Sequence, residues 1–70
     1  MKYPFVIIKQ IDNEWWYQGA DKDLDSASKT LFHLGKVSGL AIADARIVEV
    51  KDQYHLDLLR KTVNNLPESL

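Results

Sequence analysis

A two-residue turn between two apolar segments constrains this chain most strongly. Residues 3–11 are rich in β-branched and aromatic side chains, which favour a strand, and Pro4 stands at its start. Asp12 and Asn13 follow, and both tolerate the left-handed backbone region better than most residues. Residues 14–18 return with three aromatic residues in a row before Gly19. The sequence therefore predicts an antiparallel hairpin with Asp12-Asn13 as its turn.

This turn fixes the register of the hairpin, because Ile11 must then lie opposite Glu14 and Lys9 opposite Trp16. Side chains alternate between the two faces of a strand. One predicted face, expected to lie under the first helix, carries Val6, Ile8, Trp15 and Tyr17. The other carries Tyr3, Phe5, Ile7, Ile11 and Trp16. On this second face Lys9 is positioned to lie over the Trp16 ring.

A helix is predicted over residues 24–36. Leu24, Ala27, Leu31 and Leu34 recur at the spacing of one buried helical stripe. Asp23 or Asp25 is suited to cap its N-terminus, where negative charge also favours the helix dipole. Residues 45–50 predict a third strand, and residues 40–43 fit either a lead-in to that strand or a last helical turn.

The final segment fits two structures. Residues 54–58 alternate between polar and apolar, as a strand would. Leu56, Leu59 and Val63 form a helical stripe with Asp52 as a possible cap. The helix is the preferred interpretation because it also uses Leu59 and Val63. The order β-β-α-β-α then predicts a small α+β domain over residues 1–66, with helices mainly on one sheet face, and a flexible C-terminal tail over 67–70.

Size and composition narrow the class of protein. A chain of 70 residues buries only about 60% of its unfolded surface on folding. Without cysteine it has no disulfide to stabilise it. Oligomerisation is the commonest remaining way to stabilise so small a domain, so a homodimer is expected. The longest apolar run, residues 4–8, is too short for a membrane span, so we expect a cytoplasmic protein with no membrane partner. The net charge of −1 gives no general attraction to nucleic acid.

Both hairpin faces are apolar, and one helix cannot cover both. Either the second helix crosses to the other face, or the register is slipped by one residue, or the uncovered face binds a partner. A large exposed apolar patch usually marks an interaction site, and tryptophan and tyrosine often anchor interfaces.

Five acidic residues around the hairpin bear on the nature of that partner. Asp12, Glu14, Asp21, Asp23 and Asp25 lie close together in the sequence with a single lysine, Lys22, among them. Turn and capping roles account for each of them, but together they form a negative field suited to a protein partner with a basic surface. The predicted partner-binding residues are Tyr3, Phe5, Ile7, Lys9, Ile11, Asp12, Glu14, Trp16, Asp21 and Asp23.

No pattern for catalysis, cofactor binding or metal binding is found. Residues 21–25 begin like a calcium loop, but Ser26 replaces its glycine and Phe32 its glutamate. His33 and His55 are far apart and lack a second ligand nearby, and His33 falls on the exposed side of the predicted helix. The glycines form no phosphate-binding loop. We therefore predict a non-enzymatic protein without cofactor or metal.

Single-stranded nucleic-acid binding is the alternative function. Tyr3, Phe5 and Trp16 on an exposed sheet could stack bases. Lys2 and Lys9 are the only cations well placed beside them, and the acidic turn opposes those lysines. Nucleic acid is therefore the less favoured partner.

The opening residues 1–7, "MKYPFVI", resemble the first strand of HicB-type antitoxins. That resemblance implies a β-β-α-β fold and a small basic ribonuclease as partner. It covers about ten residues, and Gly19-Ala20-Asp21-Lys22 stands where the family has Pro-Asp-Leu-Pro-Gly. The chain is therefore not assigned to that family. The predicted function is a protein-binding module: a regulator or an antitoxin-like inhibitor, of the kind found in phages and plasmids.

Overall fold

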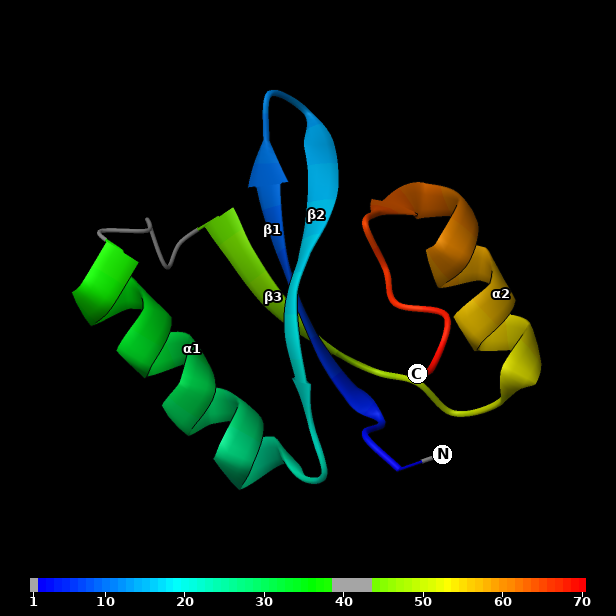
Figure 1. The fold of residues 1–70 in the computed structure, drawn as a ribbon, viewed down its shortest axis with the longest axis horizontal. Coiled ribbons are helices and arrows are strands. Elements are labelled where there is room, and N and C mark those ends of the chain that lie inside the picture. The colour runs from blue at the N-terminus through cyan, green and yellow to red at the C-terminus, as the bar shows by residue number, and fades with distance from the viewer. Residues whose placement is uncertain (1, 39–43) are drawn as a thin grey trace.

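The computed structural model describes residues 2–38 and 44–70, so both interpretations of residues 40–43 concern a region outside the described residues. The described residues form a four-stranded sheet and two helices, in the strand order β3-β1-β2-β4 (Figure 1). This confirms the α+β class and the predicted order of the first five elements. The elements are β1 (Phe5–Ile11), β2 (Glu14–Asp21), α1 (Leu24–Ser38), β3 (Ala45–Glu49), α2 (Gln53–Thr62) and β4 (Val63–Asn64).

The hairpin between β1 and β2 has the predicted turn and the predicted register. Asp12 and Asn13 both have positive φ angles, 52° and 67°, as a type I′ turn requires. Ile11 lies opposite Glu14, and Lys9 lies opposite Trp16. The slipped register considered above is therefore excluded at this end of the hairpin.

A β-bulge interrupts the hairpin further from the turn. Ile8 pairs with Tyr17, but Ile7 pairs with Gly19, so Gln18 is an extra residue in β2. The bulge resets the alternation of side chains, and Gly19 lies on the opposite face from Tyr17 instead of the same one. The sequence did not predict this bulge.

The two helices lie on opposite sides of the sheet (Figure 1). Leu56 and Leu59 of α2 pack against the face that carries Val6 and Ile8. On the other face α1 approaches Gly19, where a Cβ atom would lie 4.0 Å from the Thr30 Cγ2 atom. The second helix therefore crosses to the other face, which is one of the alternatives considered above. The expectation that both helices lie mainly on one face of the sheet is not met.

This arrangement corrects which helix covers which face. The face with Val6, Ile8, Trp15 and Tyr17 was expected under the first helix, but it packs against α2. The physical reason is the direction of β3, which pairs antiparallel with the edge of β1 that faces away from β2. The chain leaves β3 at the end of the sheet away from the hairpin turn, and from there it passes to the face that α1 leaves uncovered.

Helix α1 uses a slightly different stripe from the predicted one. Ala27 is fully buried, and Thr30, Leu31 and Leu34 are half-buried. Leu24 was predicted to belong to this stripe, but it is 56% exposed. It is the first residue of the helix, one turn before the buried part of the stripe. Thr30 takes the remaining place on the sheet side.

Helix α2 confirms the helical interpretation of the last segment, and the strand over 54–58 is wrong. Asp52 caps it as predicted, because its carboxylate accepts a hydrogen bond of 2.8 Å from the His55 backbone N–H. Val63 is not helical, although it was assigned to the helical stripe. Its backbone is extended (φ −111°, ψ 125°), and it is buried in β4, which pairs parallel with β2.

The last residues of the chain lie against the rest of the domain. Leu66 and Leu70 pack against the buried cluster on the α2 face. The Arg60 guanidinium donates hydrogen bonds to the carbonyls of Pro67, at 3.2 Å, and Glu68, at 2.9 Å. Motion of residues 67–70 would have to break these contacts. Their expected flexibility stays a prediction.

Candidate functional site

An exposed group of side chains lies at the turn end of the hairpin. Directly opposed residues of an antiparallel pair lie on the same face, so Lys9, Ile11, Glu14 and Trp16 share one face of the sheet. It is the α1 face, because Lys9 and Ile11 alternate in phase with Ile7. Ile11 is 43% exposed and Trp16 is 36% exposed. With Asp12 of the turn, these residues are called the hairpin-end surface below.

The two adjacent tryptophans have the opposite environments that the register predicted. Trp15 packs against the buried cluster on the α2 face, and its carbonyl accepts a hydrogen bond of 3.1 Å from the Asn64 side-chain amide. Trp16 points to the other face and is exposed. Only Trp15 therefore belongs to the cluster that holds the sheet, α2 and β4 together.

The predicted contact between Lys9 and the Trp16 ring is not formed. Within the described residues, ammonium groups lie over two other rings: Lys2 lies 5.8 Å from the centre of the Tyr3 ring, and Lys36 lies 4.9 Å from that of Phe32. Lys9 and Trp16 are cross-strand neighbours without this contact. Nothing in the structure explains why this contact is not formed.

The five acidic residues are divided between the two ends of β2. Asp12 and Glu14 lie at the turn, whereas Asp21, Asp23 and Asp25 lie where β2 leads into α1. The hairpin turn and the start of α1 are at opposite ends of β2 (Figure 1). Strand β2 has eight residues, which at about 3.3 Å per residue separates the two groups by roughly 23 Å. Proximity in the sequence therefore does not produce one acidic cluster.

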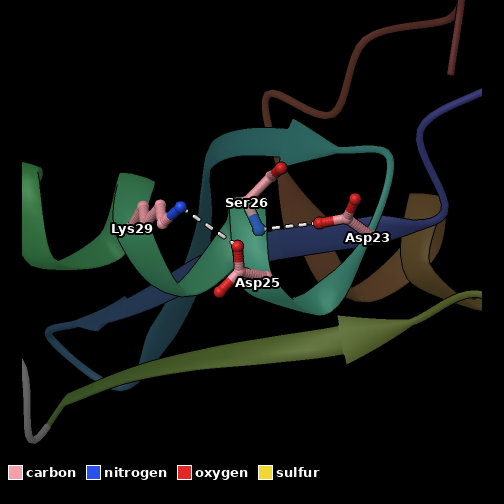
Figure 2. Close-up of polar contacts among 4 residues, drawn as sticks. All are labelled: Asp23, Asp25, Ser26 and Lys29. Carbon is pink, nitrogen blue, oxygen red and sulfur yellow. Dashed lines mark hydrogen bonds and ion pairs between the residues drawn. The ribbon is translucent and has the colours of Figure 1, made fainter.

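Two of the acidic residues near α1 have local structural partners (Figure 2). The Asp23 carboxylate accepts a hydrogen bond of 2.7 Å from the Ser26 backbone N–H, and this bond holds the pKa of Asp23 below its ordinary value. The Asp25 carboxylate lies 3.1 Å from the Lys29 ammonium one turn along the helix. Capping and an exposed ion pair account for both residues.

Asp21 lies in a more enclosed position. Its side chain is half-buried, and one carboxylate oxygen is buried without a hydrogen-bond partner among the described residues. Burial raises the pKa of the Tyr17 phenol, and the charge of Asp21 raises it further. Tyr17 therefore stays protonated at neutral pH.

The remaining predicted surface residues lie away from the hairpin turn. Tyr3 is 43% exposed and Phe5 is half-buried, but Ile7 is fully buried. Its role as a partner-contacting residue needs correction, because Ile7 is paired on both sides within the sheet on the face that α1 covers. Phe5 precedes Lys9 by four residues, or about 13 Å along a strand. The aromatic residues Tyr3, Phe5 and Trp16 therefore form no continuous platform.

The structure also exposes apolar residues that were not singled out from the sequence. On α2, Tyr54 is 73% exposed and Leu58 is 42% exposed. Their spacing of four residues, on the side away from the Leu56–Leu59 stripe, was a readable signal for an exposed pair. On α1, Phe32 is 58% exposed beneath the Lys36 ammonium.

The part of the chain that the structure describes contains no pocket and no group of three or more potential metal ligands. Among the same residues, neither helix is long and apolar enough to cross a membrane. Comparison with protein-family models, curated proteins and solved structures finds no match for the chain.

Proposed function

We propose that this chain is a small cytoplasmic protein-binding module, a regulator or inhibitor, that contacts its protein partner through the hairpin-end surface. The observation that carries the proposal is the exposure of Trp16 beside Ile11 on one face. A tryptophan next to a β-branched residue, on a rigid hairpin, has the chemistry of an interface anchor.

The charges around Trp16 suggest what kind of protein the partner is. Asp12 and Glu14 border the apolar pair on the turn side, and both are exposed. No ion pair engages them within the described residues. Lys9 is the only cation of the hairpin-end surface, so its net charge is −1. A partner with an apolar pocket and a basic rim fits this arrangement, because such charges speed association and select against acidic proteins.

The test compares two exposed aromatic residues on different parts of the molecule. Wild type, Trp16→Ala and the control Tyr54→Ala are used as bait in an extract of the native host, and retained proteins are quantified by mass spectrometry. We expect a protein that wild type and Tyr54→Ala retain and that Trp16→Ala loses. The purified protein should then bind wild type in calorimetry, with an affinity about tenfold or more above that for Trp16→Ala.

Two outcomes would contradict the proposal. In the first, Trp16→Ala retains the same proteins as wild type. In the second, wild type binds single-stranded RNA tightly and in a salt-dependent manner in fluorescence anisotropy, which would favour the nucleic-acid alternative. We expect no such binding at physiological salt, because Trp16 has one cation and two carboxylates around it.

A further inference from the structure

The backbone of β3 presents hydrogen-bonding groups to the outside of the sheet. The Val50 N–H donates a hydrogen bond of 2.7 Å to the Pro4 carbonyl. In an antiparallel ladder the residues that bond to the neighbouring strand alternate. The backbone groups of Val48 and Arg46 therefore also point toward β1. Those of the alternate residues, Ala45, Ile47 and Glu49, point outward.

One side-chain contact agrees with this orientation. The Arg46 guanidinium donates a hydrogen bond of 2.7 Å to the Ala45 carbonyl, which it reaches around the edge of the strand. Within the described residues, β3 is the outermost strand and pairs with β1 alone. An open edge of this kind is a template for another strand.

We propose that β3 binds the β3 strand of a second copy of this chain, antiparallel and edge to edge, with Ile47 opposite Ile47 on a two-fold axis. In this register every outward residue meets another outward residue, because Ala45 lies opposite Glu49 of the second copy. Three residue pairs then exchange about six backbone hydrogen bonds. The Ala45 carbonyl already accepts from Arg46, so it accepts the new bond through its second lone pair. The two sheets become one continuous eight-stranded sheet.

The side chains of β3 fit this register. On the α2 face, Arg46 lies opposite Val48 of the second copy, so its aliphatic stem covers a half-buried valine. On the α1 face, the two half-buried Ile47 side chains meet at the axis. No like charges are opposed. A shift by two residues toward the N-terminus would place Arg46 opposite Arg46, which is unfavourable.

This inference does not rest on the proposed function, because it uses the outward backbone groups of β3 and not the side chains of the hairpin-end surface, although Ala45 of β3 pairs with Lys9 of that surface. Its test is a proline at an outward N–H. Glu49→Pro removes the Glu49 N–H, which does not bond to β1, and Val48 before it is already extended. Glu49→Ala is the matched control, because it changes the same side chain and keeps the N–H.

The association of wild type and both variants is measured by sedimentation equilibrium from micromolar to millimolar concentration. We expect a dimer for wild type and Glu49→Ala, and a dissociation constant about tenfold or more higher for Glu49→Pro. A wild-type monomer throughout this range would overturn the proposal. So would equal dissociation constants for the two variants.

Amide hydrogen exchange of wild type keeps the proposal testable if Glu49→Pro fails to fold. The Ile47 and Glu49 amides should exchange about tenfold or more slowly in the dimer than in dilute solution, whereas the inward Val48 amide is protected in both. A dimer in which the Ile47 amide exchanges as fast as in the monomer would place the interface elsewhere.

Discussion

The two faces of the sheet start from similar apolar residues but are completed differently. On the α2 face, Val6 and Ile8 are buried together with residues from three later segments: Val50, Leu56, Leu59 and Val63. On the α1 face, Ile7 and Ala27 are fully buried, but Trp16 and Ile11 stay exposed near the turn. Later segments of the chain cover the α2 face, whereas the α1 face is covered only away from the hairpin turn. The sheet thus separates residues needed for folding from residues available for binding.

The strongest test of this comparison exchanges each tryptophan for alanine. Trp15→Ala removes an aromatic side chain from the α2-face cluster, so we expect a loss of about 3 kcal/mol in the free energy of unfolding. Such a loss is a large fraction of the stability of a small domain. Urea unfolding followed by circular dichroism measures it.

Trp16→Ala is the matched change on the other face. We expect it to reduce the free energy of unfolding by less than about 1 kcal/mol, because its side chain is outside the buried cluster. If Trp16→Ala were the more destabilising of the two, the assignment of the α2 face as the structural one would be wrong.

A smaller effect is expected at two neighbouring residues of β2 that face opposite ways. Gly19→Ala adds a methyl group 4.0 Å from the Thr30 Cγ2 atom, an ordinary contact distance. Glycine in a strand costs roughly 0.5–1 kcal/mol relative to alanine, so this change should stabilise the protein by that amount. Thermal unfolding measures the shift.

Ala20→Gly provides the control for that prediction, because Ala20 packs against the α2-face cluster. It should destabilise the protein by about 1 kcal/mol, through the lost methyl group and the added chain entropy. A destabilising Gly19→Ala would mean that α1 packs on the sheet more tightly than the structure has it.

The smallest expected effect concerns the cap of α1. The pKa of Asp23 is lowered by folding, so the unfolded chain takes up a proton first as pH falls. The stabilisation is therefore complete above the ordinary pKa of 3.8 and is lost as pH falls through the lower folded value. Asp23→Asn keeps a capping side chain without the charge. Its difference from wild type in urea unfolding should be largest at neutral pH and vanish in strong acid; a difference independent of pH would contradict this.

Local patterns predicted much of this fold, because the features they describe depend on neighbouring residues. The Asp12-Asn13 turn fixed the register of the hairpin, and with it the separation of Trp15 from Trp16. The Asp52 cap and the Leu56–Leu59 spacing identified α2. Each of these follows from residues within one turn or one hairpin.

The features that sequence reasoning missed depend on residues far apart in the chain. The bulge at Gln18 is set by pairing across the hairpin, and the two residues of β4 are too few to produce an alternating pattern. The division of the acidic residues follows from the direction of β2, which carries Asp21 away from Asp12. The pattern of β1 and β2 shows which side chains share a face, but the path of the chain after β3 decides which helix covers it.

The parallel pairing of β2 with β4 has a consequence for the order of events during synthesis. The bond from Asn64 to Trp15 joins residues 49 positions apart, and a ribosome adds only about 5–20 residues per second. The hairpin residues can pair within microseconds, and they are synthesised seconds before α2 and β4. During that interval Val6, Ile8 and Trp15 form an uncovered apolar surface on the nascent chain, which chaperones or neighbouring nascent chains can reach.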